Sequence, residues 1–155
     1  MRSAGTIAAV DLFCGVGGLT HGLTRAGIDV RLGVDLDPAC RYPIETNNQS
    51  RFLEADVDEL MPSDIQRAFG DSELTLLAGC APCQPFSSYA QAARRATPHS
   101  DWELLNAFSK LVLAVKPTLV TMENVPPLLK QPIFRKFVAD LHDAGHYLDY
   151  RVVDG

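Results

Sequence analysis

Hydrophobic residues along this chain follow two alternating patterns. Short apolar runs predict buried strands, and between them apolar residues recur at helical spacing, which predicts helices. The predicted strands cover residues 7–13, 28–34, 52–55, 74–78, 119–122 and 147–153. The predicted helices lie at 19–26, after Pro38, at 63–69, from Ser100 to before Pro117, and around 134–141. Strands that alternate with helices predict an α/β fold with a doubly wound, mostly parallel sheet.

Two of these helices have specific signals at their start. Asp37 precedes Pro38, and an acidic cap followed by proline is typical of a helix N-terminus. Ser100 and Glu103 have the spacing of a capping box, and an apolar stripe of helical period follows them. We therefore expect helices to begin at both places.

Residues 81–100 interrupt the alternation of strands and helices. The segment contains several prolines and the pair Arg94-Arg95. Connections this long are uncommon in compact domains and usually serve a function. We therefore expect a functional loop here.

The composition fits one soluble globular domain. The chain has 155 residues, of which 46% are hydrophobic and 21% are charged, which is sufficient for an ordinary core. No run approaches the ~20 apolar residues of a membrane span, and the N-terminus lacks the apolar core of a signal peptide. The expected location is the cytoplasm, without a membrane partner.

Cysteine usage and net charge narrow the expected chemistry. Four cysteines are too few for a secreted disulfide scaffold, so reduced thiols are expected. The net charge is −5, whereas a protein that holds duplex DNA by itself usually has a basic face. Any basic surface for DNA must therefore be local or supplied from elsewhere.

The residues that follow the first two predicted strands indicate a nucleoside site. Ligands of open α/β sheets bind beyond the carboxyl ends of the strands. Gly15, Gly17 and Gly18 allow close approach of the backbone to a ligand, and Asp35 can accept hydrogen bonds from ribose hydroxyls. The turn lacks the G-x-G-x-x-G spacing of a dinucleotide site, which disfavours a nicotinamide cofactor. Alternatively, these glycines only turn the chain tightly.

Two further strand ends carry a thiol and a carboxyl group. Cys83 follows the fourth predicted strand and Glu123 follows the fifth, an arrangement that suggests covalent catalysis. Cys80 and Cys83 also form a C-x-x-C pair, so a redox pair and half of a zinc site are alternatives. Zinc would need two more ligands that the scattered cysteines and histidines do not supply. A redox pair usually opens a helix, which Pro85 disfavours.

Three segments occur in the order and spacing of cytosine-5 DNA methyltransferases. They are Asp11-Leu12-Phe13-Cys14-Gly15-Val16-Gly17-Gly18, Pro82-Cys83-Gln84-Pro85-Phe86-Ser87 and Glu123-Asn124-Val125. The chain resembles this family from Val10 to Val153, and the second and third segments are the most diagnostic. The resemblance implies the Rossmann-like fold of S-adenosylmethionine-dependent methyltransferases. It also implies one catalytic and donor-binding domain over residues 1–155, incomplete at its C-terminal end.

The resemblance implies roles for individual residues. Cys83 would be the nucleophile that adds to carbon 6 of a cytosine flipped out of double-stranded DNA, and Glu123 would hold the pyrimidine edge. The S-adenosylmethionine site would contain Phe13, Gly15, Gly17, Asp35, Leu36, Asp56, Val57 and Pro82. The DNA contacts would come from Gln84, Ser87, Arg94 and Arg95. No metal is expected, and a merely solvated loop is the alternative for the arginine pair.

The chain also departs from the family pattern. Many relatives carry an aspartate and an arginine where this chain has His99-Ser100-Asp101-Trp102-Glu103-Leu104. The family continues after the sixth strand with an arginine-bearing segment, a target-recognition region and a last helix. We therefore expect half of a DNA (cytosine-5-)-methyltransferase of restriction-modification type, which needs a second polypeptide or the missing C-terminal region. The alternative is a non-catalytic remnant or S-adenosylmethionine-binding module.

Overall fold

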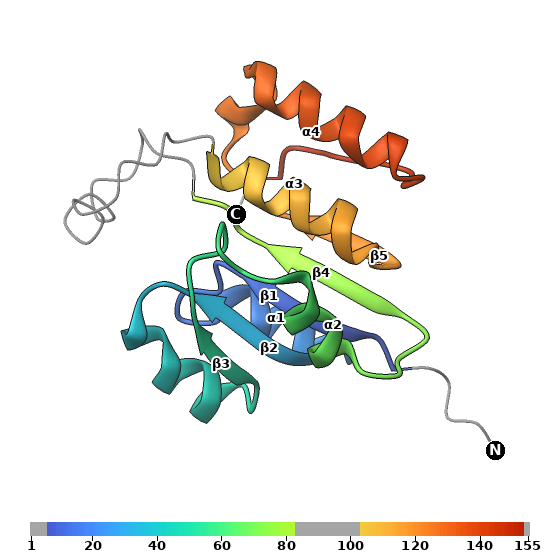
Figure 1. Ribbon diagram of the computed structural model, residues 1–155. Coiled ribbons are helices and arrows are strands. Elements are labelled where there is room, and N and C mark those ends of the chain that lie inside the picture. The colour runs from blue at the N-terminus through green and yellow to red at the C-terminus, as the bar shows by residue number, and fades with distance from the viewer. Residues whose placement is uncertain (1–5, 83–102, 154–155) are drawn as a thin grey trace.

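A five-stranded parallel sheet forms the centre of the protein. The computed structural model describes residues 6–82 and 103–153. The strands are β1 (Ala8–Leu12), β2 (Asp29–Asp35), β3 (Arg51–Glu54), β4 (Thr75–Gly79) and β5 (Leu119–Met122). Their order is β3-β2-β1-β4-β5, and every neighbouring pair is parallel (Figure 1). The predicted doubly wound α/β sheet is confirmed, and the strand order reverses direction between β1 and β4.

Helices cover both faces of the sheet because the strand side chains alternate between two apolar clusters. One face packs against α2 (Pro62–Phe69), α3 (Glu103–Val115) and α4 (Pro132–Asp143). The opposite face packs against α1 (Gly18–Arg25), through Leu19 and Leu23. Figure 1 shows α1 behind the sheet and α2 in front of it. The central strands β1, β2 and β4 are thereby fixed between two layers, and the carboxyl ends of the parallel strands remain at one edge.

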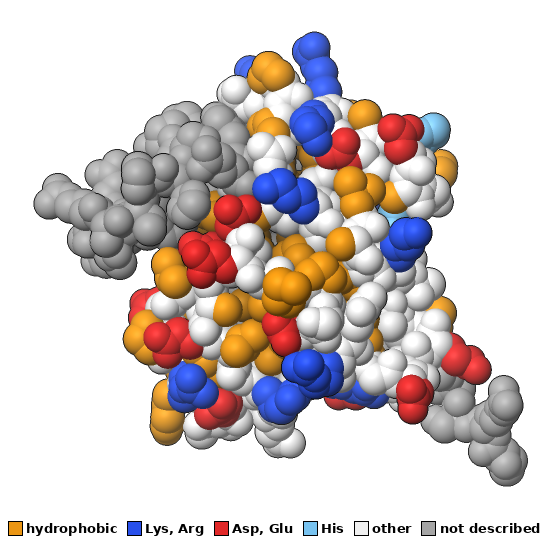
Figure 2. Space-filling model, viewed as in Figure 1, with side chains coloured by type: hydrophobic (Ala, Val, Ile, Leu, Met, Phe, Trp, Pro, Cys, Tyr) orange, Lys and Arg blue, Asp and Glu red, His pale blue; other side chains and the backbone are white. Residues whose placement is uncertain are grey.

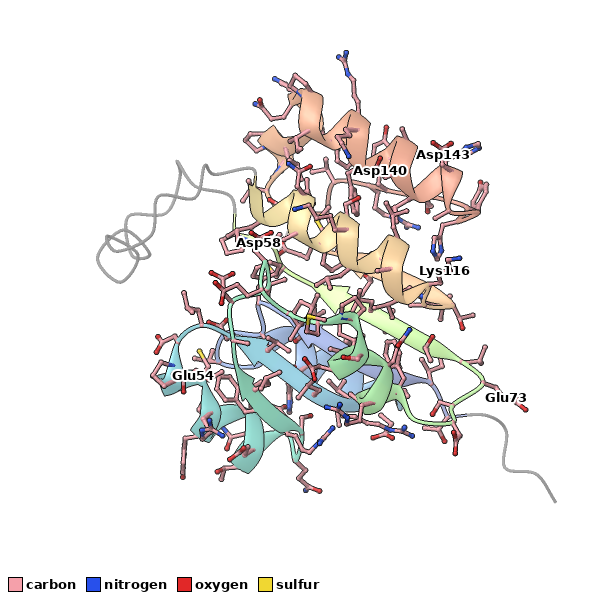
Figure 3. The ribbon with its side chains drawn as sticks, in the orientation of Figure 1. Glu54, Asp58, Glu73, Lys116, Asp140 and Asp143 are labelled. Atoms are coloured by element: carbon pink, nitrogen blue, oxygen red, sulfur yellow. The ribbon has the colours of Figure 1, made fainter. Side chains whose placement is uncertain are left out.

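The helices α3 and α4 pack on each other as well as on the sheet. The rings of Phe108 and Phe137 lie 5.9 Å apart between centroids. Ser109 Oγ donates a 2.8 Å hydrogen bond to Asp140, whose position between the two helices is visible in Figure 3. Gly79 allows α3 to approach the end of β4, because a Cβ there would lie 2.7 Å from the Phe108 ring. These contacts hold the end of β4 against α3.

A bulge in β2 sets which side chains face each layer. Ala9 pairs with Val30 and Val10 pairs with Leu32, so Arg31 is an extra residue. The Arg31 guanidinium donates a 2.6 Å bond to the carbonyl oxygen of Phe69, at the end of α2. The extra residue therefore bends the strand and places a cation at a helix C-terminus, where it is favourable.

The predicted helix after Pro38 is observed, but its hydrogen bonding is irregular. The backbone is helical from Pro38 to Asn47, as a 3₁₀-helix η1 (Pro38–Cys40), two α-helical residues and a π-helix η2 (Pro43–Asn47). The predicted cap is confirmed, because the Asp37 side chain accepts a 2.9 Å bond from the amide of Ala39. Pro43 has no amide hydrogen to donate, and the hydrogen-bonding pattern changes at this residue.

The predicted sixth strand is wrong. Residues 147–153 have no strand structure, and they follow α4 without joining the ladder of β5. The side chains of Tyr147 and Val153 are 97% and 74% exposed. Leu148 packs against the core, but a strand also needs a neighbouring strand to pair with, and within the described residues this segment pairs with none.

The remaining elements agree with the sequence pattern within the described residues. A 3₁₀-helix η3 (Pro126–Lys130) precedes α4. Most of the predicted loop at 81–100, and Ser100 of the predicted capping box, lie outside the described residues. In the parts that the structure does describe, no helix has the length and apolar character required to cross a membrane.

Candidate active site

The candidate site lies at the carboxyl ends of β1, β2, β4 and β5. These ends meet where the strand order reverses, which is where ligands bind in open α/β sheets. A backbone bond from the Cys80 amide to the Leu12 carbonyl, 3.3 Å long, joins the ends of β1 and β4. The site therefore has a half built on β1 and β2 and a half built on β4 and β5.

The turn after β1 has the left-handed backbone that its glycines predict. Phe13, Gly15 and Gly17 have φ values of 58°, 52° and 90°. A Cβ on Gly17 would lie 2.6 Å from Asn48 Nδ2. A Cβ on Gly15 would meet no atom within 4 Å. The turn is therefore closed on the side of Asn48 and open beside Gly15.

Asp35 holds this turn from the end of β2. One carboxylate oxygen accepts a 2.9 Å bond from the amide of Gly15, and the other accepts a 3.0 Å bond from the amide of Asp37. Each carboxylate oxygen has a second lone pair, so two backbone bonds leave acceptor capacity for a ligand. The structure thus brings together Gly15 and Asp35, which are both predicted for the S-adenosylmethionine site. The half-exposed Leu36 follows Asp35 directly in the sequence.

The two residues after β3 that are predicted for the S-adenosylmethionine site differ in the burial of their side chains. Asp56 is partly exposed, and one of its oxygens accepts a 3.0 Å bond from the amide of Asp58. The side chain of Val57 is buried in the core with residues of β1 and β2. Any contact of Val57 with a ligand would therefore have to come from its backbone.

Side chains and backbone join the ends of β4 and β5. The Cys80 thiol donates a 2.7 Å bond to Glu123 Oε2. The Asn124 side-chain amide donates a 2.9 Å bond to the carbonyl oxygen of Ala81, and the Glu123 amide donates a 3.1 Å bond to Gly79. Glu123 is thereby held beside the segment that leads to Pro82, the last described residue before Cys83.

The predicted nucleophile and DNA contacts lie outside the described residues. They are Cys83, Gln84, Ser87, Arg94 and Arg95. Their roles therefore remain predictions.

Two of the four cysteines belong to the core. Cys14 and Cys40 are buried with Ile44 and Phe52. Burial, together with the nearby carboxylates Asp35 and Asp37, raises the pKa of the Cys40 thiol to about 11. Burial also raises the pKa of the Cys14 thiol well above its ordinary value. Both thiols are therefore protonated and poorly nucleophilic at neutral pH.

Sequence reasoning missed a buried polar pair beneath the glycine turn. Asp11 and Thr20 are completely buried, and Thr20 Oγ1 donates a 2.6 Å bond to Asp11 Oδ2. Burial, and to a smaller extent repulsion by Asp35, raises the pKa of Asp11 to about 6, although the bonds from Thr20 oppose this rise. The available signal was an acidic residue inside the apolar run of β1.

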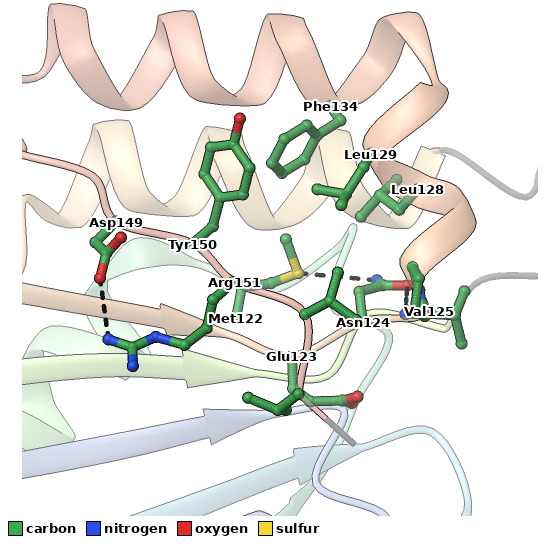
Figure 4. Close-up of a pocket in the computed structure, with 13 residues that line it drawn as sticks. Met122, Glu123, Asn124, Val125, Leu128, Leu129, Phe134, Asp149, Tyr150 and Arg151 are labelled. Atoms are coloured by element: carbon green, nitrogen blue, oxygen red, sulfur yellow. Dashed lines mark hydrogen bonds and ion pairs between the residues drawn. The ribbon is translucent and has the colours of Figure 1, made fainter. Parts of the chain in front are cut away.

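A pocket opens next to Glu123. Its volume is about 570 Å³, and it lies between the end of β5, α4 and residues 149–153 (Figure 4). Phe134 and Tyr150 supply an aromatic wall, with ring centroids 5.2 Å apart. Arg151 and Asp149 form an ion pair of 3.2 Å at the pocket. The size is in the range of small-molecule sites.

The described surface has no uniform charge on the face seen in Figure 2. Lys and Arg side chains there are interspersed with acidic ones, around an apolar centre. Several cations of the described residues are paired with carboxylates, as in the ion pairs Arg67–Asp64 and Lys110–Asp58. This face of the described residues therefore lacks a continuous basic surface for DNA.

The fold and the strand-end residues define the Rossmann-like class of methyltransferases. An E. coli prophage protein assigned as a DNA modification methyltransferase superimposes with a TM-score of 0.70. It is 27% identical, over 89% of this chain and 38% of its own. The S. pombe Dnmt2 methyltransferase superimposes with a TM-score of 0.63 over 88% of this chain and 42% of its own. At 21% identity, the latter shares the fold.

Sequence comparison identifies the family within that class. The model of the family "C-5 cytosine-specific DNA methylase" matches residues 7–155, and the chain belongs to this family. The type II methylase M.HgiDII of Herpetosiphon aurantiacus is 40% identical over 94% of this chain and 41% of its own length. The type II methyltransferase M.XorII of Xanthomonas oryzae pv. oryzae is 31% identical over 94% of this chain and 35% of its own. This chain therefore spans less than half of either relative.

Proposed function

We propose that this chain is the donor-binding and nucleophile-bearing part of a DNA (cytosine-5-)-methyltransferase. The reaction would transfer a methyl group from S-adenosylmethionine to carbon 5 of a cytosine in double-stranded DNA. Family membership and the type II methyltransferase relatives support this class of reaction. The same type II relatives are the basis for proposing a role in restriction-modification.

The joined ends of β4 and β5 are the observation that carries the proposal. Covalent addition to a pyrimidine needs a thiol at one face of the ring and a carboxyl group at its edge. The Asn124 side chain donates to Ala81, which lies two residues before Cys83 in the sequence. Glu123, the residue before Asn124, accepts a bond from Cys80. A nucleophile at position 83 and a carboxyl group at position 123 would therefore begin from neighbouring points of the backbone.

The glycine turn and Asp35 fit S-adenosylmethionine. The open space beside Gly15 lets a ligand approach the backbone, and Asp35 retains acceptor capacity for ribose hydroxyls. Phe13, Leu36, Asp56 and Pro82 would complete the pocket, with the backbone of Val57. When bound, S-adenosylmethionine would supply an electrophilic methyl group.

The protein's own contribution would be covalent activation of the base. The Cys83 thiolate would form a bond to carbon 6, and the displaced π-electron pair would make carbon 5 nucleophilic. Glu123 would stabilise the charge that develops at ring nitrogen 3 and the exocyclic amine. After methylation, loss of the carbon 5 proton would expel Cys83 and restore the aromatic ring.

Target recognition would come from a second polypeptide or from a further region of a longer chain. This chain spans 41% and 35% of two relatives that it matches. The mixed charge of the face in Figure 2 supports a second source of phosphate contacts. Gln84, Ser87, Arg94 and Arg95 would contribute local contacts beside the flipped base.

Covalent capture of DNA tests the proposal. DNA containing 5-fluorocytosine blocks the last elimination, so an active enzyme remains attached and shifts on a denaturing gel. The chain is tested with S-adenosylmethionine, alone and mixed with extract of its source, and Cys83→Ser is the control. We expect a shift that requires Cys83. A folded chain that gives no shift under either condition would contradict the proposal.

A second candidate function is S-adenosylmethionine binding without catalysis. It is favoured by the fact that the Gly15–Asp35 bond, which organises the donor half, lies entirely within β1, β2 and the turn between them. Calorimetric binding of S-adenosylmethionine together with no capture of DNA would support this second function over the first.

A further inference from the structure

Cys80 and Glu123 lie directly beyond the last paired residues of β4 and β5. Gly79 pairs with Met122 at the ends of these two parallel strands. The amide of Cys80 donates a 3.3 Å bond to the carbonyl oxygen of Leu12, and the amide of Glu123 donates a 3.1 Å bond to that of Gly79. The sheet therefore fixes the backbone of both residues, and their side chains extend from defined positions.

The thiol of Cys80 makes the two carboxyl oxygens of Glu123 unequal. Cys80 Sγ donates a 2.7 Å bond to Glu123 Oε2. In a protonated carboxyl group one oxygen donates its proton, and the other remains an acceptor. A donor directed at Oε2 therefore favours the proton on Oε1. Oε2 keeps a second lone pair, so it can accept one more hydrogen bond.

The bond from Cys80 is the one that orients this carboxyl group. Within the described residues, no other side chain is hydrogen-bonded or ion-paired to the carboxyl group of Glu123. The neighbouring Asn124 side chain donates to the carbonyl oxygen of Ala81 instead. Glu123 is exposed and lines the pocket of about 570 Å³, so a ligand can reach it (Figure 4).

We propose that Cys80 is a positioning residue that makes Glu123 selective for cytosine over uracil. The inference rests on the proposed function, in which Glu123 holds the pyrimidine edge. At that edge cytosine has an exocyclic amine, which donates, beside ring nitrogen 3, which accepts. Uracil has the reverse order, with a carbonyl oxygen that accepts beside an N3–H group that donates. Recognition of cytosine thus requires one carboxyl oxygen that accepts and one that donates, in a fixed order.

The bond from Cys80 sets this order. Oε2 of Glu123 would accept from the thiol and from the cytosine amine, while Oε1 would donate its proton to ring nitrogen 3. Uracil would require the proton on Oε2, which is the oxygen that the thiol holds as an acceptor. A site built for one set of hydrogen bonds strongly rejects a base that leaves its polar groups unpaired. Without the thiol, the proton can occupy either oxygen, so either base can be matched.

Covalent capture of two matched DNA duplexes tests the inference. One carries 5-fluorocytosine at the target position and the other carries 5-fluorouracil, so the two bases differ only at the edge that Glu123 would hold. The ratio of the two capture rates is measured with S-adenosylmethionine under reducing conditions, with an inhibitor of uracil-DNA glycosylase and with source extract where the wild type requires it. Cys80→Ala should lower this ratio roughly tenfold, as expected for loss of a hydrogen bond to a charged group. Cys80→Ser, whose hydroxyl also donates, should retain the ratio.

The ratio separates positioning from a general structural role. Loosened ends of β4 and β5 would slow capture of both bases equally, so an unchanged ratio in Cys80→Ala would overturn the inference. A ratio that rises would also overturn it, because Oε2 would then face ring nitrogen 3. If Cys80→Ala does not fold, Cys80→Val and Cys80→Thr, which match in shape and differ in the hydroxyl donor, provide the same comparison. A folded wild-type chain that captures neither duplex would contradict the proposed function, and the inference with it.

Discussion

Alanine at position 17 should destabilise the protein because two separate constraints require glycine there. Gly17 has φ 90°, and its missing Cβ would lie 2.6 Å from Asn48 Nδ2 and 3.0 Å from Ile44 Cδ1. The left-handed backbone costs an L-residue roughly 1–2 kcal/mol. Overpacking against two buried side chains costs roughly 1–3 kcal/mol more. The free energy of unfolding should therefore fall by roughly 2–5 kcal/mol in Gly17→Ala.

Gly22→Ala is the matched control in the same element. Gly22 lies on the exposed side of α1, and a Cβ there would meet no atom within 4 Å. Alanine is the better helix former by roughly 0.8–1 kcal/mol, so this variant should be more stable than the wild type. The substitution of glycine by alanine is thus expected to change the free energy of unfolding in opposite directions at two positions five residues apart.

Urea unfolding followed by circular dichroism measures both changes. The two variants should leave the dependence of the free energy on urea concentration unchanged, because neither alters the surface exposed on unfolding. A destabilisation of Gly17→Ala below about 1 kcal/mol, or the same sign for both variants, would refute the reasoning. Restored stability in Gly17→Ala combined with Asn48→Ala would identify the clash as the larger cause.

Three other outcomes follow from the described contacts. The pKa of Asp11 rises from 3.8 to about 6 on folding. The contribution of Asp11 to stability is therefore full below pH 3.8 and is lost, by roughly 3 kcal/mol, as the pH rises from 3.8 through 6, a loss that urea titrations of Asp11→Asn should not show. Asn124→Ala should reduce capture of 5-fluorocytosine DNA more than it reduces stability, because Ala81 loses its bond near the nucleophile. Ser109→Ala should cost about 1 kcal/mol by thermal unfolding through the lost bond to Asp140, and no change would show that this bond contributes little.

The elements predicted best were those with strong local signals. The strand at 119–122 was predicted with the observed bounds, because Pro117 ends the preceding helix and a short apolar run follows. The cap at Asp37 was also predicted, since an acidic residue before proline has a direct local cause. The change from 3₁₀ to π hydrogen bonding within the helix after Pro38 was not predicted.

Predictions failed where the outcome depends on distant neighbours. The apolar pattern at 147–153 resembles that of a strand, but only the tertiary arrangement determines whether another strand lies beside it. The C-x-x-C spacing drew attention to Cys83 as the partner of Cys80. In the structure Cys80 donates to Glu123, which is 43 residues away. No local pattern predicts that bond.

The candidate S-adenosylmethionine site was predicted only in part, because some of its contacts depend on strand order and others on distant packing. Gly15 and Asp35 follow successive strands, so parallel pairing brings them together and their contact could be anticipated. The burial of the Val57 side chain depends on how the segment after β3 turns toward the core, which the local sequence does not determine.

The bulge at Arg31 limits how the length of β2 can change during evolution. Side chains of a regular strand alternate between its two faces, but Val30 and Leu32 face opposite layers although Arg31 stands between them. Loss of Arg31 would therefore restore regular alternation, with Val30 still opposite Ala9 and Leu32 still opposite Val10. Loss of a residue between Leu32 and Asp35, with the bulge kept, would instead move Asp35 by one residue, about 3.3 Å, from the amide of Gly15. A one-residue deletion in β2 should therefore be tolerated far better at position 31 than after it.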